Sequence, residues 1–223
     1  HIQQDGIDIL KAANDIELVI AYDQDKETLL TTVSDANLVI TRSSTPVNEK
    51  FLNATKSLEY IIRAGVGVDN VDIEGCSKLG IVVMNVPTAN TIAAVELTMT
   101  HMLSCMRTFP YAHGQLKNER VWKRENWYGN ELNGKTLGVI GFGNIGSRVA
   151  IRSKAFDMNV VAFDPYISSS KVTDLGMTYT TNFDDILNCD LITIHTPKNK
   201  ETLNMIGKEE IAKMRDGVIL INC

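Results

Sequence analysis

Three glycines and one aspartate are the residues whose types and spacing most clearly indicate chemistry. Gly141, Gly143 and Gly146 form a G-x-G-x-x-G run, and Asp164 follows eighteen residues later. A glycine turn that opens a helix can bring backbone amides close to a pyrophosphate, because glycine has no Cβ and the amino end of a helix favours negative charge. A carboxylate at the end of the next strand can accept hydrogen bonds from a ribose diol. The pattern therefore predicts a dinucleotide site.

Apolar runs around the glycines supply the elements that such a site requires. Residues 137–140 are typical of a buried strand, residues 145–156 of a helix with an apolar face, and residues 160–163 of a second strand that ends at Asp164. A G-x-G-x-x-G run alone often marks only a turn. Strand, glycine turn, helix, strand and terminal acid together indicate dinucleotide binding.

Asp164 also predicts which dinucleotide is bound. A 2'-phosphate held about 4 Å from this carboxylate would meet a repulsion of roughly 4 kcal/mol per unit charge at an effective dielectric constant of about 20. No arginine follows to offset the repulsion, because the next residues are Pro, Tyr, Ile and Ser. The sequence therefore predicts NAD as the cofactor, and not NADP.

The composition is that of an ordinary globular protein. The 223 residues are 44% hydrophobic and 22% charged, with a net charge of -5, and the length suffices for one large or two smaller domains. The acidic balance argues against a nucleic-acid partner, and no apolar run is long enough to cross a membrane. The four scattered cysteines form no C-x-x-C pair. They indicate reduced thiols, a cytoplasmic location, and neither a disulfide nor a metal site.

Helical and strand patterns alternate along the chain, which predicts an α/β fold with parallel sheets. Asp25 is a candidate N-cap in the first part. Beyond Pro87, a helix over residues 91–106 is apolar on most sides, and it is therefore expected to be buried between domains or, as we favour, in a dimer. The chain opens on a helical pattern and closes on an apolar strand, so both domains are expected to be incomplete. The predicted strands cover residues 17–20, 37–40, 58–62, 81–84, 137–140, 160–163, 191–194 and 218–223.

Two arginines follow neighbouring strands of the first part. Arg42 follows one strand, and Arg63 follows the next and leads into Gly65 and Val66. Free amides at these two positions could bind a carboxylate at the carboxyl end of a parallel strand. A tight turn carrying a surface arginine explains the run equally well. Two arginines at adjacent strand ends nevertheless indicate an anionic substrate.

His195 follows the strand over residues 191–194, where an imidazole could act as an acid or a base. No carboxylate is obviously placed to orient it, so we favour a packing or backbone role. Thr196 and Pro197 are better explained as a loop that edges the cofactor. His101 lies within the long apolar helix and is expected to be a core or interface residue.

Several segments in combination resemble the D-2-hydroxyacid dehydrogenases. The resemblance covers nearly the whole chain and implies two Rossmann-like domains with parallel sheets. A flavodoxin-like substrate-binding domain would span residues 1–88, without its first strand and C-terminal return. A doubly wound NAD-binding domain with a dimerisation helix would span residues 89–223, without its C-terminal part. The segments are residues 63–70 (RAGVGVDN), 85–87 (NVP), 94–98 (AVELT), 131–138 (ELNGKTLG), 195–197 (HTP) and 221–223 (INC), together with the glycine run.

Motif positions in this family imply the binding residues. A phosphorylated 2-hydroxy acid suits a set of three arginines, and Arg124 would reach the site of a neighbouring subunit in a homodimer or tetramer formed through the NAD domain. The implied substrate contacts are Arg42, Arg63, Gly65, Val66 and Arg124. The implied NAD contacts are Val66, Gly141, Gly143, Asn144, Ile145, Gly146, Asp164, Thr196 and Cys223.

The reaction that the resemblance implies is NAD-dependent oxidation of a D-2-hydroxy acid by hydride transfer. The family's catalytic arginine would follow two residues after Cys223, with a glutamate and a histidine further on, and none of the three is in this sequence. We therefore expect no catalytic residue within the chain and essentially no turnover by the chain as given. Two alternatives stay open: a dehydrogenase for another D-2-hydroxy acid such as glycerate, and a non-catalytic NAD-sensing interaction protein.

Overall fold

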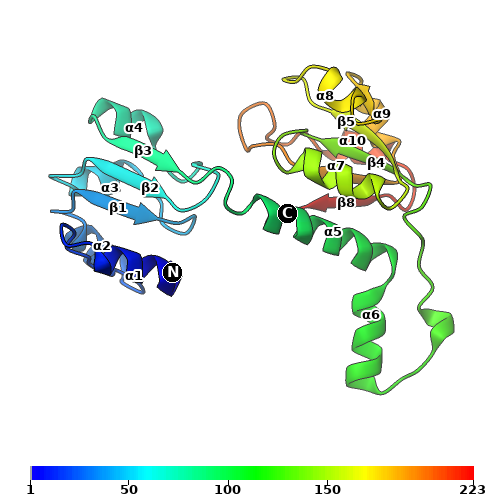
Figure 1. Ribbon diagram of the computed structural model, residues 1–223, viewed down its shortest axis with the longest axis horizontal. Coiled ribbons are helices and arrows are strands. Elements are labelled where there is room, and N and C mark those ends of the chain that lie inside the picture. Colours follow the sequence, from blue (N-terminus) through cyan, green and yellow to red (C-terminus); the bar gives the residue numbers. More distant parts are fainter. Residues whose placement is uncertain (1) are drawn as a thin grey trace. The chain divides into compact units, whose positions relative to one another are not determined.

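The computed structural model describes residues 2–223 as two compact units, one ending at Ala89 and the other beginning at Asn90. In Figure 1 the first unit runs from blue to cyan and the second from green to red. Each unit contains one sheet, and every strand pair in both sheets is parallel. The predicted α/β class with parallel sheets is confirmed.

Unit 1 has a three-stranded sheet in the order β1-β2-β3. Its core, which includes Val47, Phe51 and Ile61, packs the sheet against the neighbouring helices. Asp25 caps α2 as predicted, because its carboxylate accepts the amides of Glu27 at 2.9 Å and Thr28 at 3.0 Å. The elements are α1 (Gln4–Ala12), α2 (Lys26–Thr32), β1 (Leu38–Thr41), α3 (Glu49–Ala54), β2 (Tyr60–Arg63), α4 (Ile73–Lys78) and β3 (Val82–Asn85).

The strand predicted over residues 17–20 does not form, and that prediction is wrong. Val19 and Ile20 are 62% and 44% exposed. The strand β1 pairs with β2 alone, and its other edge is not paired with this segment. An apolar run becomes a strand only where a neighbouring strand satisfies its backbone hydrogen-bonding groups. Apolar composition by itself does not show whether such a neighbour is present.

Unit 2 has a five-stranded sheet in the order β6-β5-β4-β7-β8, so the chain moves outward from β4 on one side and then crosses to the other. The elements are α5 (Thr91–Met106), α6 (Phe109–Gly114), a π-helical turn (Gln115–Glu119), a 3-10 turn (Arg124–Asn126), β4 (Thr136–Ile140), α7 (Gly146–Lys154), β5 (Asn159–Phe163), α8 (Ser170–Thr173), β6 (Thr178–Thr180), α9 (Phe183–Leu187), β7 (Leu191–Ile194), α10 (Lys208–Lys213) and β8 (Ile219–Asn222).

Helices cover both faces of this sheet, which explains why its strands are apolar at consecutive positions. On one face, Leu137 and Val139 of β4 join a core cluster that contains residues of α5 and α7. On the other, Ile140 of β4 packs with Ile186 of α9. The alternation of side chains along each strand therefore places hydrophobic residues in two separate layers.

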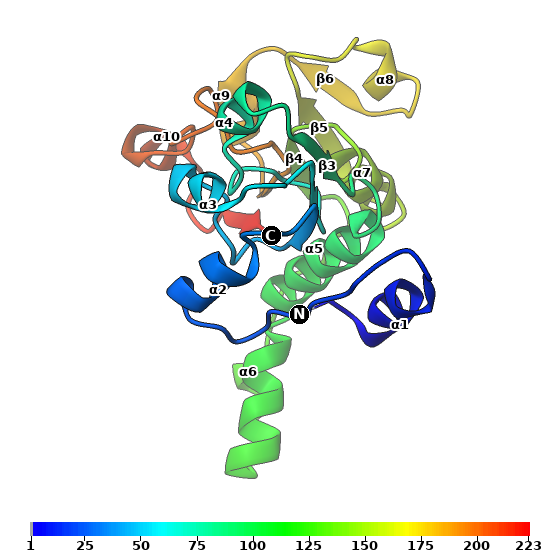
Figure 2. The same cartoon turned by 90° about the vertical axis from the view of Figure 1, so that its left-hand side faces the viewer.

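The helix α5 has the predicted bounds, but its sides differ in burial. Val95 and Met102 are fully buried within unit 2, whereas Ile92 and Leu97 are 44% and 48% exposed. Beyond α5, the chain continues into α6, which extends away from the sheet of unit 2 in both views (Figures 1 and 2). Neither α6 nor the π-helical turn was predicted from the sequence.

Candidate functional site

The turn between β4 and α7 is built around two glycines. Gly141 has φ +86°, and a Cβ at this position would lie 2.8 Å from the carbonyl oxygen of His195. A Cβ at Gly146 would overlap the carbonyl oxygen of Gly141. Both positions therefore exclude larger residues, as a tight strand-to-helix turn requires.

Gly143 differs from these two glycines because it faces open space. A Cβ at this position would meet no atom within 4 Å. No side chain caps the amino end of α7, where Ile145 is the N-cap residue. The turn thus presents backbone to solvent beside the positive end of a helix dipole, an arrangement suited to a pyrophosphate.

The carboxylate of Asp164 is held beside this turn by backbone amides. Its Oδ2 accepts the amide of Phe142 at 2.8 Å, and its Oδ1 accepts the amide of Tyr166 at 2.9 Å. Each carboxylate oxygen has two lone pairs, so each can accept a further hydrogen bond. Asp164 is therefore oriented at the end of β5 and can still bind the two hydroxyls of a ribose.

The loop after β7 lies on the other side of the glycine turn. The side chain of Thr196 approaches Gly141, because a Cβ on that glycine would be 3.1 Å from Thr196 Cγ2. Cys223 is exposed and follows β8 at the same carboxyl edge of the sheet. Thr196 and Cys223 thus share this edge with the glycines and Asp164.

The imidazole of His195 is partly buried and has a hydroxyl partner. Its Nε2 lies 2.9 Å from Oγ1 of Thr193. Burial lowers the pKa of His195 to about 4, so the ring is neutral at neutral pH. The structure fits the packing role that we favoured. Thr193 could have been found from the sequence, because residues two apart on a strand share a face.

In unit 1, Arg63 ends β2 and sits beside Thr41 of β1 in the strand register. Its guanidinium passes over Gly65, where a Cβ would overlap Nη1. A larger residue here would displace the flexible end of the Arg63 side chain, and the backbone at Gly65 is not left-handed. The Gly65 amide donates to the Arg63 carbonyl at 2.8 Å. The expectation that this amide is free to bind a carboxylate is therefore wrong; Val66 remains the candidate.

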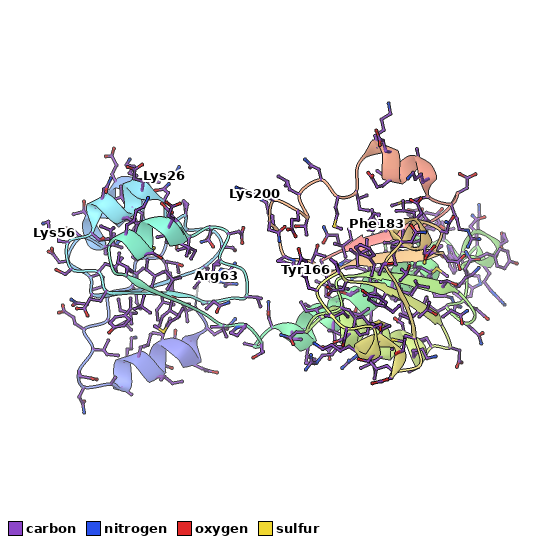
Figure 3. All side chains as sticks on the ribbon, turned by 90° about the horizontal axis from the view of Figure 1, so that it is seen from above. Lys26, Lys56, Arg63, Tyr166, Phe183 and Lys200 are labelled. Carbon is purple, nitrogen blue, oxygen red and sulfur yellow. The ribbon has the colours of Figure 1, made fainter. Side chains whose placement is uncertain are left out.

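Three buried polar atoms at this edge have no hydrogen-bond partner: Thr41 Oγ1, Arg63 Nε and Asn70 Oδ1. The amide group of Asn70 donates to the carbonyls of Arg42 at 3.0 Å and Thr45 at 2.7 Å. Asn70 therefore ties the loop after β1 to the segment that follows Arg63. Leaving a buried polar group unpaired costs about 1–3 kcal/mol, so this cluster is a candidate binding site (Arg63 is labelled in Figure 3).

The remaining predicted residues lie at exposed positions. Asn144 is exposed in the glycine turn, and its carbonyl accepts Arg148 Nη1 at 2.7 Å. Val66 is 37% exposed, and its carbonyl accepts the side-chain amide of Asn85 at 2.7 Å. Arg124 is exposed in the 3-10 turn of unit 2, while Arg42 and Arg63 belong to unit 1.

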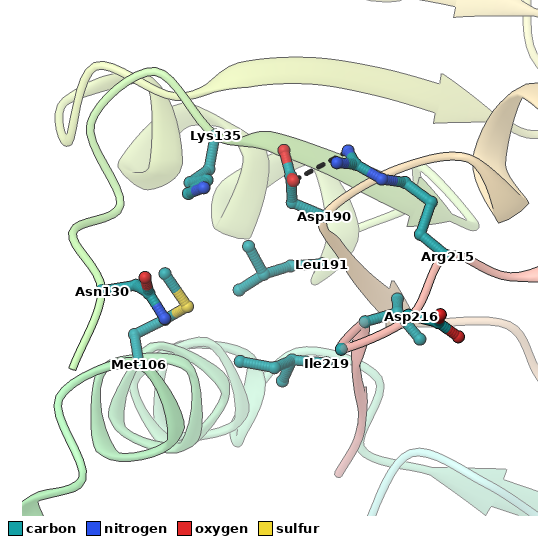
Figure 4. A pocket seen from close by; sticks show the side chains of 10 residues that line it. Met106, Asn130, Lys135, Asp190, Leu191, Arg215, Asp216 and Ile219 are labelled. Carbon is teal, nitrogen blue, oxygen red and sulfur yellow. Dashed lines mark hydrogen bonds and ion pairs between the residues drawn. The ribbon is translucent and has the colours of Figure 1, made fainter. Parts of the chain in front are cut away.

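A pocket of about 290 Å³ lies at the opposite, amino-terminal edge of the unit 2 sheet (Figure 4). Its polar wall is centred on Asp190, which accepts Arg215 Nη1 at 2.8 Å and the amide of Thr136 at 2.9 Å. These bonds tie the start of β4 to the residues that precede β7 and β8. The pocket is separated from the glycine turn by the length of the strands, and we assign it a structural role.

Within residues 2–223, no group of three or more His, Cys, Asp or Glu side chains is arranged to hold a metal ion. In the same residues, no helix combines the length and the apolar character needed to cross a membrane. All four cysteines are free thiols.

The family model "D-isomer specific 2-hydroxyacid dehydrogenase, NAD binding domain" matches residues 99–223. The chain belongs to this family. The matched residues include the glycine turn and Asp164, so the cofactor is NAD and the family's chemistry is that of oxidoreductases. The predicted family and cofactor are confirmed.

Individual relatives are similar along almost the entire chain. The chain is 41% identical over 222 residues to D-3-phosphoglycerate dehydrogenase of Archaeoglobus fulgidus and 44% identical over 223 residues to that of Bacillus subtilis. The alignments include 99% of this chain for the A. fulgidus relative and 100% for the B. subtilis relative. In both cases the chain spans only 42% of the relative's length. Among solved structures, D-lactate dehydrogenase of Aquifex aeolicus with NAD and lactic acid matches at a TM-score of 0.88 and 32% identity, over 99% of this chain and 66% of that one.

Proposed function

We propose that this chain belongs to an enzyme that oxidises D-3-phosphoglycerate to 3-phosphohydroxypyruvate, the first step of serine biosynthesis, by hydride transfer to NAD. The observation that carries the proposal is the identity of 41% and 44%, across both units, to relatives named D-3-phosphoglycerate dehydrogenase. Unit 1 would bind the substrate and unit 2 the cofactor. A cytoplasmic location is part of the proposal, and the four free thiols support it.

In unit 2, the proposed NAD contacts follow the carboxyl edge of the sheet. The open backbone at Gly143 and the uncapped amino end of α7 suit the pyrophosphate. Asp164, oriented by two amides, suits the ribose diol. The full proposed set consists of Gly141, Gly143, Asn144, Ile145, Gly146, Asp164, Thr196 and Cys223, with Val66 contributed by unit 1.

In unit 1, the proposed substrate contacts are cationic. The unpaired Nε of Arg63 supports an anionic ligand, because a guanidinium gains most from a charged acceptor. Arg42 follows the adjacent strand end, and the Val66 amide lies three residues after Arg63. Arg124 of another subunit would complete the set around a doubly charged phosphate.

The proposal includes a homodimer or tetramer formed through unit 2. The exposed side chains of Ile92 and Leu97 on α5 support it, as do Phe109 and Tyr111 on α6, which are 63% and 54% exposed. Large exposed apolar side chains are a feature of subunit interfaces.

We assign no catalytic residue within residues 1–223. The strongest titratable candidate, His195, is neutral, partly buried and bonded to Thr193, and no carboxylate partner is found for it in the described residues. The readout that tests the proposal with this chain is therefore binding, and not turnover.

Calorimetric titration with D-3-phosphoglycerate and with D-glycerate, in the presence of NAD, separates the leading candidates. We expect binding of the phosphorylated acid to be tighter by roughly tenfold or more, the equivalent of at least one charge-assisted hydrogen bond. Equal affinities would contradict the proposal. They would favour a dehydrogenase for another D-2-hydroxy acid, which the similarity to D-lactate dehydrogenase at a TM-score of 0.88 also supports.

A further inference from the structure

Two loops flank the glycine turn, and one hydrogen bond joins them. Because β4 lies between β5 and β7, the loops that follow β5 and β7 lie on opposite sides of the turn after β4. Tyr166 belongs to the first loop, and its hydroxyl donates to the carboxylate of Glu201 in the second. This bond crosses the carboxyl end of β4, where open parallel sheets bind their ligands.

Each partner of this bond is anchored in its own loop. The amide of Tyr166 donates to Oδ1 of Asp164 at 2.9 Å, so the tyrosine is tied to the proposed ribose ligand. The amides of Glu201 and Thr202 both donate to Oδ1 of Asn199 at 2.9 Å. Within residues 2–223, we find no other hydrogen bond between the two loops. The bond between Tyr166 and Glu201 is therefore a bridge between two separately stabilised segments.

We propose that Tyr166 and Glu201 form a clasp that closes the adenosine end of the NAD crevice and must open for the nucleotide to pass. The inference rests on NAD binding by unit 2, which is part of the proposed function, but not on the identity of the hydroxy acid. Both residues are highly exposed, as a clasp that opens and closes requires. They act as positioning residues, through the loops that carry them.

The phenol of Tyr166 is protonated at neutral pH and can therefore donate. The hydrogen bond to Glu201 raises the pKa of Tyr166, and the charges of Glu201 and Asp164 raise it further. Figure 3 labels Tyr166 and also Lys200, the residue next to Glu201 in the facing loop.

Stopped-flow fluorescence of NADH binding, without any hydroxy acid, tests the clasp. In Tyr166→Phe and in Glu201→Ala, we expect association and dissociation both to accelerate by about threefold to tenfold, as expected for loss of one exposed charge-assisted hydrogen bond. The dissociation constant should change less than either rate, because the proposed clasp closes in both the free and the bound state and its loss therefore affects both rates alike. Glu201→Gln keeps an acceptor oxygen and should remain close to the wild type.

The double variant Tyr166→Phe/Glu201→Ala should be no faster than either single variant, because both remove the same bond. Tyr60→Phe and Glu209→Ala, which alter exposed residues elsewhere, serve as matched controls and should leave both rates unchanged. Unchanged rates in Tyr166→Phe would overturn the clasp. So would additive effects, or an effect on dissociation alone, which would indicate a direct contact with NADH. Because no substrate is present, failure of the phosphoglycerate assignment would not affect these measurements.

Discussion

The carboxyl edges of the two sheets satisfy their polar groups in different ways. In unit 2, Asp164 accepts two backbone amides and His195 pairs with Thr193, so the edge is internally bonded without a ligand. In unit 1, the edge leaves Arg63 Nε and two other buried polar atoms without partners. Buried polar groups are normally paired. The first edge is thus preorganised, whereas the second keeps unpaired polar groups, which fits the substrate site that we propose there.

The two edges should therefore respond oppositely to mutation. At the preorganised edge, a change that breaks an existing internal contact costs stability together with affinity. A change at an incomplete edge removes a group that gains its partner only from the ligand, so affinity should fall without loss of stability. The following four predictions test this contrast.

The largest effect is expected from Asp164→Asn. The substitution keeps an acceptor for the Phe142 amide but removes the charge that would repel a 2'-phosphate. NADPH affinity relative to NADH should rise by up to about a thousandfold, the equivalent of roughly 4 kcal/mol. Fluorescence titration with both nucleotides measures the ratio, and Asp174→Asn is the control. An unchanged ratio would show that Asp164 does not face the ribose.

Gly146→Ala and Gly143→Ala should separate folding from binding within one turn. The added methyl group at position 146 would overlap the Gly141 carbonyl, so we expect a loss of about 3 kcal/mol in the free energy of unfolding of unit 2. At position 143 the methyl group meets open space, so stability should hold while NADH affinity falls. Urea denaturation and NADH titration measure the two effects. A stable Gly146→Ala protein would refute the tight packing.

Arg63→Met tests the incomplete edge of unit 1. The affinity for D-3-phosphoglycerate should fall by about tenfold to a hundredfold, because a charge-assisted hydrogen bond is lost. The melting temperature should not fall, because the variant removes a buried donor that lacks a partner. NADH affinity should be unchanged, as it should also be in the control Arg152→Met. A clear loss of stability in Arg63→Met would mean that Arg63 serves the fold, and the contrast between the edges would fail.

The smallest effect concerns the pH dependence of stability. Burial lowers the pKa of folded His195 to about 4, below its unfolded value of about 6.5. Between these values the unfolded chain binds more protons, so stability falls as the pH falls. From pH 7 to pH 5 we expect a loss of about 2 kcal/mol. Denaturation at several pH values should show this slope for the wild type and a flatter one for His195→Gln. Identical slopes would contradict the burial argument.

Elements that depend on local signals were predictable from the sequence. The cap at Asp25, the bounds of α5 and the tight packing at Gly146 all follow from residue type and spacing. These signals lie within a few residues of the feature that they determine. Predictions of this kind therefore required no knowledge of tertiary contacts.

Features that depend on distant partners were not predictable. The segment 17–20 has the composition of a strand, but it does not pair with the open edge of β1, and composition does not show which strand a segment will join. Tyr166 and Glu201 meet because the strands that precede their loops, β5 and β7, lie on either side of β4 in the sheet. In both cases the missing information was spatial adjacency. The amide of Gly65, which was expected to be free, is a different case: it bonds locally to the Arg63 carbonyl, because residue types alone did not reveal the conformation of this turn.

Strand order also has a consequence for how each unit folds. In unit 1, every strand pairs with the next one in the sequence, so its sheet can grow by short steps. In unit 2, β4 must pair with β7, and Thr136 bonds to Asp190, 54 residues away. Closing so long a loop reduces the chain's conformational entropy before the stabilising contacts between β4 and β7 form, and this slows folding. Pulse-labelled hydrogen exchange should therefore protect the amides of β4 and β5 before those of β7 and β8.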